Sequence, residues 1–261
     1  MMHPMIDPVA FYVGSWGVHW YGLAYISGFF WVWFMGARVI RKERLSWISC
    51  EVYEGVLCAL MLGLVLGGRV GYMLFYQFSS WLAHPLLVFR IWEGGMSFHG
   101  AVVGVGIAAW IQTRCHRLQF LALTDLILPW VPVGLGLGRI CNFINGELWG
   151  RPTHQDWGVV FPWVDAQLRH PSQLYEFGLE GLLLMGMMLW ARRRYVRQGQ
   201  VTGIFILLYG LIRFAVEYVR MPDAQLGFLF HTGWLTMGQC LSMPMILLGF
   251  YLLYVKAKSS V

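Results

Sequence analysis

The sequence predicts an all-α polytopic membrane protein with seven transmembrane helices. Hydrophobic residues make up 58% of the 261-residue chain and charged residues only 12%, whereas about 25% of the residues in soluble domains are charged. A membrane-spanning helix needs about 20 mostly apolar residues, and seven stretches of the chain approach this length. They cover residues 18–37, 54–75, 97–113, 121–138, 174–191, 202–219 and 237–255.

The basic residues predict the orientation of these spans, because short cytoplasmic loops collect Lys and Arg. Most of the 19 basic residues follow the first, third, fifth and seventh spans. These are Arg38, Arg41, Lys42, Arg44, Arg114, Arg117, Arg192, Arg193, Arg194, Arg197, Lys256 and Lys258. We therefore expect the amino terminus outside the cytoplasm and the carboxyl terminus inside it. A signal peptide carries its positive charges before its apolar stretch; here Arg38 follows that stretch, so the first span is expected to be retained.

Composition also limits the kind of protein. The five cysteines form no C-x-x-C pair, so neither a zinc site nor a disulfide framework is indicated. The net charge of +6 is accounted for by the cytoplasmic loops, which argues against a nucleic-acid partner. Without repeats or linkers, residues 1–261 are expected to form a single integral membrane domain, with a small outer head region around residues 139–172. Glycines that recur every four residues predict close helix packing: Gly63, Gly67, Gly71, Gly100, Gly104, Gly134 and Gly138.

Residues 138–150, with the sequence GRICNFINGELWG, form the strongest candidate site. They place Arg139, Asn142, Asn145 and Glu147 directly after an apolar run. A charge near the bilayer interior costs about 3 kcal/mol on insertion scales, so such groups are rare and usually face a polar cavity or a partner. Arg139 and Asn142 are three residues apart and share one face of the fourth helix if that helix continues so far.

Other polar residues fall mostly toward the outer ends of the spans, and each has a structural alternative. Arg213 and Glu217 are one helical turn apart and can form an ion pair. Arg69 can extend its guanidinium to lipid headgroups, and His99 can be a hydrogen-bonded core histidine. Residues 19–22 can belong to an aromatic belt at the interface.

A second polar segment, residues 169–176, begins the fifth span. Helix initiation would explain two of its residues, since Ser172 can cap the helix and Glu176 suits the positive end of the helix dipole. Three residues are left unexplained: His170, Gln173 and Tyr175.

The run from Gly138 to Gly150 resembles the signature of the bacterial prolipoprotein diacylglyceryl transferases. Further segments resemble parts of that family in the same order along nearly the whole chain: residues 19–22, 67–72, 94–100, 170–176, 209–213 and 220–225. The resemblance implies transfer of the diacylglyceryl group of phosphatidylglycerol to the lipobox cysteine of a preprolipoprotein signal peptide, forming a thioether and releasing glycerol phosphate. It also implies a bacterial cytoplasmic (inner) membrane protein, in contact with membrane lipids, whose amino terminus and active site face the periplasm.

On this resemblance, the residues of the strongest site take specific catalytic and binding roles. The planar guanidinium groups of Arg139 and Arg213 match the oxygens of a phosphate leaving group. Glu147, together with Asn142 and Asn145, is expected to orient the arginine and the glycerol headgroup.

The acceptor cysteine must be ionised to react, and a free thiol with a pKa of about 8.5 is largely protonated at neutral pH. His99 is the candidate base, because histidine exchanges protons near neutral pH. A cationic field from the arginines is the alternative source of activation, and both fit the sequence. Tyr21, Arg69 and Tyr175 are expected at the lipid entrance. The other expected substrate-binding residues are Gly150, Gln173, Tyr209 and Glu217. No metal and no cofactor are expected.

Two other classes of protein use some of the same features. In a lipid or anion transporter, the buried arginines would line a pathway, but the chain lacks internal repeats and its polar groups concentrate in one leaflet. A membrane chaperone for lipoproteins would need a peptide-binding surface but no buried arginines.

Overall fold

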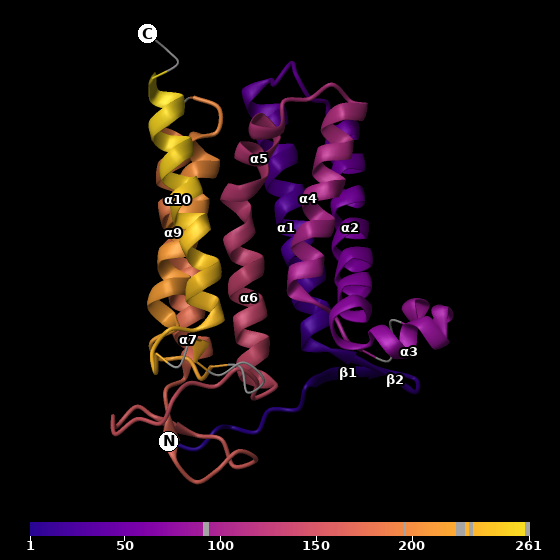
Figure 1. Ribbon diagram of the computed structural model, residues 1–261. Coiled ribbons are helices and arrows are strands. Elements are labelled where there is room, and N and C mark those ends of the chain that lie inside the picture. Colours follow the sequence, from indigo (N-terminus) through magenta and orange to yellow (C-terminus); the bar gives the residue numbers. More distant parts are fainter. Residues whose placement is uncertain (91–93, 196, 223–227, 230–231, 259–261) are drawn as a thin grey trace. The chain divides into compact units, whose positions relative to one another are not determined.

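The computed structural model is mostly helical and describes residues 1–90, 94–195, 197–222, 228–229 and 232–258. Each of the seven predicted spans coincides with a helix or with consecutive helices (Figure 1). Within the described chain, five helical segments are long and apolar enough to cross a membrane: Trp20–Glu43, Cys50–Tyr76, Phe120–Ile144, Ser172–Arg194 and Met237–Tyr254. The apolar helix Gln200–Val216 is shorter. This supports the predicted class, an all-α polytopic membrane protein.

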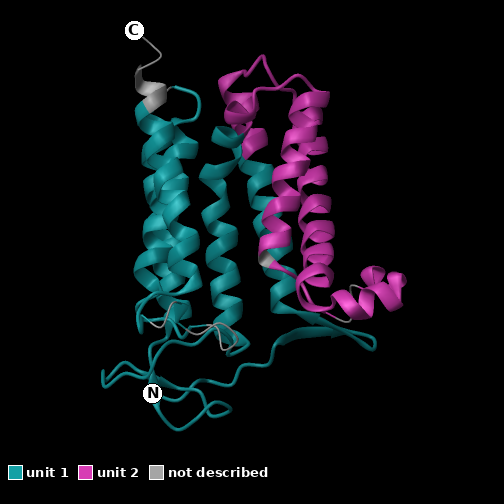
Figure 2. Ribbon diagram, viewed as in Figure 1, with its two compact units in different colours: residues 1–35, 124–261 teal, residues 36–123 magenta. Residues whose placement is uncertain are grey.

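The chain divides into two compact units (Figure 2). Unit 1 comprises residues 1–35 and 124–261, and unit 2 comprises residues 36–123. Two helices contribute residues to both units: α1, Trp20–Glu43, and α5, Phe120–Ile127.

Unit 2 is built around the packed pair α2 and α4, which cover Cys50–Tyr76 and Phe98–Cys115. In the sequence, α2 and α4 are separated by two short helices, α3 at Phe78–Ala83 and η1 at Pro85–Phe89. The predicted glycines make the α2–α4 contact: a Cβ on Gly67 would lie 2.4 Å from Gly100 O, and one on Gly104 would lie 2.0 Å from Gly63 O. Larger side chains would force these helices apart, so the packing prediction for these glycines is confirmed.

Unit 1 contains the remaining helices and two short hairpins. The helices are η3 Leu128–Trp130, α6 Val131–Ile144, α7 Ser172–Glu176, η4 Phe177–Leu183, α8 Leu184–Arg194, α9 Gln200–Val216 and α10 Met237–Lys258. Strands β1, Val9–Val13, and β2, Trp16–His19, form an antiparallel hairpin before α1. Strands β3, Val159–Val160, and β4, Leu168–Arg169, pair in the same way between α6 and α7.

The core of unit 1 lies between α8 and α9, where six side chains are buried together: Leu184, Met188, Ala191, Val201, Ile204 and Phe205. The start of α9 is fixed by Asp125, whose carboxylate accepts from Gly199 N at 2.5 Å and from Thr202 N at 2.7 Å. The first amide groups of a helix lack partners inside the helix. Asp125 therefore supplies from α5 the acceptor that α9 needs at its amino end.

Candidate active site

Arginines from α6 and α9 and glutamates from α7 and η4 form a buried ion cluster in unit 1. Arg139 of α6 contacts Glu180 with Nε and Nη2, both at 2.9 Å, and contacts Glu176 with Nη1 at 3.1 Å. Arg213 of α9 contacts Glu176 with Nη1 at 2.8 Å. Both glutamate side chains have 0% of their surface exposed, against 15% and 14% for the arginines. The two arginines predicted to bind phosphate are thus joined through one carboxylate.

The cluster continues along α9 and past its end. Arg213 Nη2 lies 2.5 Å from Glu217 Oε1, which confirms the ion pair predicted from their spacing. The other oxygen of Glu217 accepts from Thr236 Oγ1 at 2.9 Å. Arg220 adds a third guanidinium, with Nη1 3.4 Å from Glu176 Oε1. Tyr209, one turn before Arg213, interacts electrostatically with the same arginines.

The backbone has two unusual features where Arg139 meets Glu180. Glu180 lies in η4, a π-helical stretch, and π-helical turns often occur at functional sites. Next to it, Gly181 approaches Gly136 of α6 so closely that a Cβ on Gly136 would lie 3.0 Å from Gly181 Cα. Because Arg139 is one turn beyond Gly136, this contact of the two backbones places its guanidinium beside Glu180.

The helix-initiation interpretation of residues 169–176 is wrong. Pro171 is the residue before α7, and no side chain caps this helix. The Ser172 hydroxyl instead donates to Leu148 O at 2.8 Å. Glu176 is committed to the three arginines of the cluster and is completely buried, so ion pairing rather than the helix dipole explains it.

A second network, which we call the asparagine–glutamate network, comprises Asn142, Asn145 and Glu147 at the end of α6. Asn145 Nδ2 donates to Glu147 Oε1 at 2.9 Å, and Asn142 Nδ2 lies 3.5 Å from Glu147 Oε2. Asn142 also donates to Tyr21 Oη at 2.5 Å. Since α6 extends to Ile144, Asn142 and Arg139 share its face as predicted. The Arg139 side chain is oriented by Glu176 and Glu180 of the ion cluster, rather than by this network as the sequence had suggested.

The loop after α6 is fixed by the second polar segment. Gln173 Nε2 donates to Glu147 O at 2.5 Å, and Gly150 N donates to His170 O at 2.9 Å. A Cβ on Gly150 would lie 2.5 Å from that same oxygen, so only glycine fits this approach. Leu148, which lies between Glu147 and Gly150 in the sequence, has a φ of 56°, an uncommon conformation for a residue with a side chain. The predicted residues Gly150 and Gln173 therefore shape the loop that carries Glu147.

Tyr175 lies at the outer edge of this loop. Its hydroxyl accepts from Trp157 Nε1 at 2.8 Å and lies 3.3 Å from His170 Nδ1. Burial lowers the pKa of the His170 imidazole below its usual value, because the charged form loses hydration. Burial therefore favours the neutral form of this imidazole.

The other two predicted site residues, Arg69 and His99, belong to unit 2. The Arg69 side chain donates to four backbone carbonyls, those of Leu87, Val88, Gly94 and Gly95. Only 3% of Arg69 is exposed, so the alternative in which it extends to lipid headgroups is wrong. Its observed contacts hold the segment that precedes α4.

His99 is exposed and lies in the first turn of α4. The amino end of this helix is capped by Ser97, whose hydroxyl accepts from Gly100 N at 3.3 Å. The exposure of His99 contradicts the core-histidine alternative and leaves its imidazole accessible.

Residues 223–225, part of the sequence resemblance, lie outside the described residues.

Glu180 is the important residue that sequence reasoning missed. It is the only acidic residue inside the predicted span 174–191 apart from Glu176 near its start. The rarity of charge in a membrane span, which singled out Arg139, applies equally to Glu180. That signal was available without any structure.

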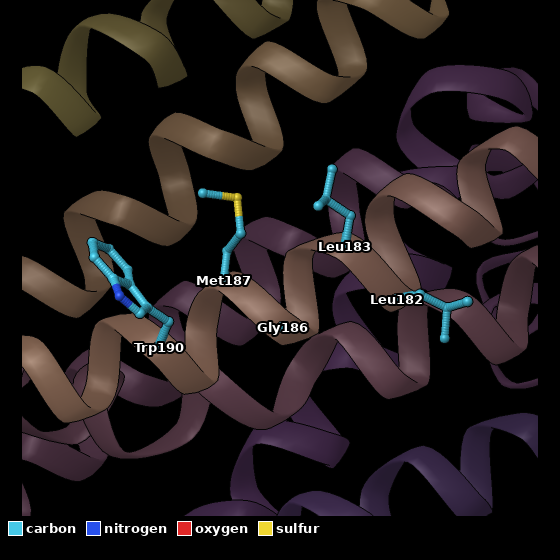
Figure 3. Close-up of a pocket in the computed structure, with 5 residues that line it drawn as sticks. All are labelled: Leu182, Leu183, Gly186, Met187 and Trp190. Atoms are coloured by element: carbon cyan, nitrogen blue, oxygen red, sulfur yellow. The ribbon is translucent and has the colours of Figure 1, made fainter.

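An apolar surface lies on the other side of the same helical segment. Leu182, Leu183, Gly186, Met187 and Trp190 line an open pocket along η4 and α8 (Figure 3). Leu182 is 63% exposed, whereas Glu180 and Leu184 are 0% exposed. One face of the segment thus carries the buried charges, and another presents apolar side chains of the kind that contact lipid chains.

Comparison with known proteins shows the family to which the chain is related. Residues 8–255 match the family model described as prolipoprotein diacylglyceryl transferase. A Legionella pneumophila (strain Corby) protein named phosphatidylglycerol–prolipoprotein diacylglyceryl transferase is 49% identical over 257 residues, covering 98% of this chain and 99% of that protein. Proteins of the same name from Chromohalobacter salexigens and Xanthomonas campestris pv. campestris (strain B100) are 51% and 48% identical. The former alignment covers 95% of this chain and 92% of the relative, and the latter 98% and 93%.

Proposed function

The chain belongs to the prolipoprotein diacylglyceryl transferase family, and we propose on that basis that it transfers the diacylglyceryl group of phosphatidylglycerol to a prolipoprotein. The acceptor is the thiol of the lipobox cysteine in the signal peptide. The products are a thioether-linked diacylglyceryl cysteine and glycerol phosphate. The observation that carries the proposal is the convergence of Arg139 and Arg213 on the buried carboxylate of Glu176.

The ion cluster leaves the arginines able to bind a phosphate. A guanidinium has five N–H donors, and the contacts of Arg139 with Glu176 and Glu180 use its three nitrogens once each. One N–H on each terminal nitrogen therefore stays free for an oxygen of the substrate. The carboxylates of Glu176 and Glu180 fix the orientation of the Arg139 guanidinium before the lipid binds. This reduces the loss of side-chain entropy on binding.

The reaction is a displacement at the glycerol carbon that bears the phosphate oxygen. The acceptor thiolate forms a carbon–sulfur bond as the carbon–oxygen bond breaks, and the electron pair of that bond goes to the phosphate oxygen. Negative charge grows on this leaving group, and Arg139 and Arg213 are proposed to stabilise it. The thiol proton goes to a base, for which His99 is proposed on its chemistry and accessibility. Electrostatic activation of the thiol by the arginines remains the alternative.

The remaining residues are proposed to bind and orient the lipid. Asn142, Asn145 and Glu147 offer amide and carboxylate groups that suit the glycerol headgroup, and Tyr21 extends this network through Asn142. Further positions are proposed around the loop and the ion cluster: Gly150, Gln173, Tyr175, Tyr209 and Glu217. Arg69 is proposed to act only through the segment before α4 that its side chain holds.

We also propose seven spans in the bacterial cytoplasmic membrane, with the amino terminus in the periplasm and the carboxyl terminus in the cytoplasm. The helices at each predicted segment and the alternation of basic loops support this arrangement. In this topology most site residues of unit 1 lie toward the periplasmic ends of the spans or just beyond them, so the active site would face the periplasmic leaflet.

A reconstituted transfer reaction tests the proposal. Purified protein in detergent, given phosphatidylglycerol and a peptide with a lipobox cysteine, should form a thioether-linked product without metal, nucleotide or membrane potential. Mass spectrometry would detect the added diacylglyceryl group. A transporter would leave the peptide unmodified, and that result with folded protein would refute the proposal.

A further inference from the structure

A buried histidine near the amino terminus contacts the end of α6. His3 is only 3% exposed. Its backbone N donates to Val160 O at 2.9 Å, so residues 1–3 run along β3. Its ring nitrogen Nε2 lies 2.6 Å from Phe143 O, two residues before the Asn145 side chain of the asparagine–glutamate network.

The hydrogen bonds of His3 define which nitrogen carries the proton. Met5 N donates to Nδ1 at 3.0 Å, so Nδ1 must be an unprotonated acceptor. Nε2 then carries the hydrogen and donates to Phe143 O. The carbonyl of Phe143 also accepts from Gly146 N at 3.0 Å, and the carbonyls at the end of a helix lack partners within the helix. His3 therefore supplies a side-chain donor to this oxygen from outside the helix.

Three aromatic rings enclose the imidazole and extend the contact to the loop. The ring centroids of Phe143, Phe161 and Trp163 lie 4.8, 5.3 and 4.9 Å from that of His3. Trp163 Nε1 donates to Gly146 O at 3.2 Å. A Cβ on Gly146 would lie 1.8 Å from the Trp163 ring, so the indole packs directly on the backbone of the turn.

We propose that His3 is a positioning residue for lipid binding, acting through the turn at residues 143–146 on the asparagine–glutamate network. Asn142 directly precedes Phe143, Asn145 is two residues after it, and Glu147 follows Gly146. Glu147 N donates to Asn142 O at 2.8 Å within the same turn. A shift of the Phe143 carbonyl would therefore displace all three side chains. The inference rests on the proposed function, since it assumes that this network binds the lipid headgroup.

The test compares His3→Met with His3→Gln, which are close in size but differ in hydrogen bonding. His3→Met removes the donor to Phe143 O, whereas the amide of His3→Gln retains one. We expect the KM for phosphatidylglycerol to rise about three- to tenfold in His3→Met, the effect of losing one ordinary hydrogen bond. We expect kcat to change less than about twofold, because the ion cluster is untouched, and His3→Gln to recover part of the KM. His3→Leu carries the same test if the methionine side chain is not accommodated.

His154→Leu is the matched control, because His154 is an exposed histidine of the same outer region. It should behave as the wild type. Rates are expressed per folded protein, measured by size-exclusion chromatography. A purely structural role would lower the yield of folded protein and leave KM unchanged, and that outcome would overturn the inference. Absence of thioether product with the wild-type protein would instead count against the proposed function.

Discussion

Glu176→Gln is the substitution that most directly tests the ion cluster. It keeps the volume of the side chain nearly constant and removes a negative charge that three arginines contact at 2.8, 3.1 and 3.4 Å. Arg139 keeps Glu180 and Arg213 keeps Glu217 as partners. The variant therefore leaves about one buried positive charge uncompensated.

Breaking a buried ion pair by removing one partner costs about 3–5 kcal/mol. Because two of the three arginines retain a carboxylate, we expect the lower end, about 3 kcal/mol. An anion that binds in place of the lost charge would restore much of this. A ligand at 100 times its Kd stabilises a protein by about 2.7 kcal/mol, so glycerol phosphate should stabilise Glu176→Gln more than the wild type.

The assay is the apparent unfolding temperature in detergent, with and without glycerol phosphate, and with glycerol as the neutral control ligand. Asp165→Asn serves as a matched variant, since Asp165 pairs with Arg169 in the outer loop and is 33% exposed. It should unfold close to the wild-type temperature. If Glu176→Gln is as stable as the wild type, or gains no more from glycerol phosphate than from glycerol, the reasoning about a charge-balanced phosphate site is refuted.

Lys at Arg139 or Arg213 keeps the charge but loses the planar fork; transfer should fall at least about a hundredfold in each folded variant, and near-normal rates would leave only a structural ion pair. His99→Gln should lower the transfer rate, with a deficit that shrinks as pH rises toward the thiol pKa of about 8.5; a deficit constant across pH, measured by initial rates, would remove the base role. Variants that retain only Cys50 or only Cys115 should resist an impermeant thiol reagent until cells are permeabilised, and labelling of intact cells would contradict the seven-span topology.

The parts of the site that sequence alone could predict are those set within one helix. Arg213 and Glu217 are four residues apart, so α-helical geometry is enough to pair them. Arg139 and Glu180 are 41 residues apart, and their contact depends on where α6 meets η4. The close approach of Gly136 and Gly181 that creates it follows from tertiary packing, which no local pattern encodes.

The helices were predicted better than the polar loop after α6. Long apolar segments identify helices by composition, and each predicted span coincides with helical structure. The loop depends instead on single backbone conformations, such as the φ of 56° at Leu148, and on buried donors from a distant segment. Ser172 shows the difficulty: its position before a helix suggested a cap, yet its hydroxyl reaches Leu148 O. A preference of one residue type cannot choose between a local and a distant acceptor.

The π-helical stretch Phe177–Leu183 also bears on how the length of this chain could vary. A π-helical turn closes hydrogen bonds to the fifth residue instead of the fourth, so it takes up an extra residue while the flanking α-helix keeps its direction. Removal of one residue from this stretch would let it relax to an α-helix. Glu176 and the core residue Leu184 could then keep their faces, while Glu180 between them would rotate and rise relative to Arg139. Shortening the helix here would thus spare the packing at both ends of the stretch and alter the contact of Glu180 with the cluster.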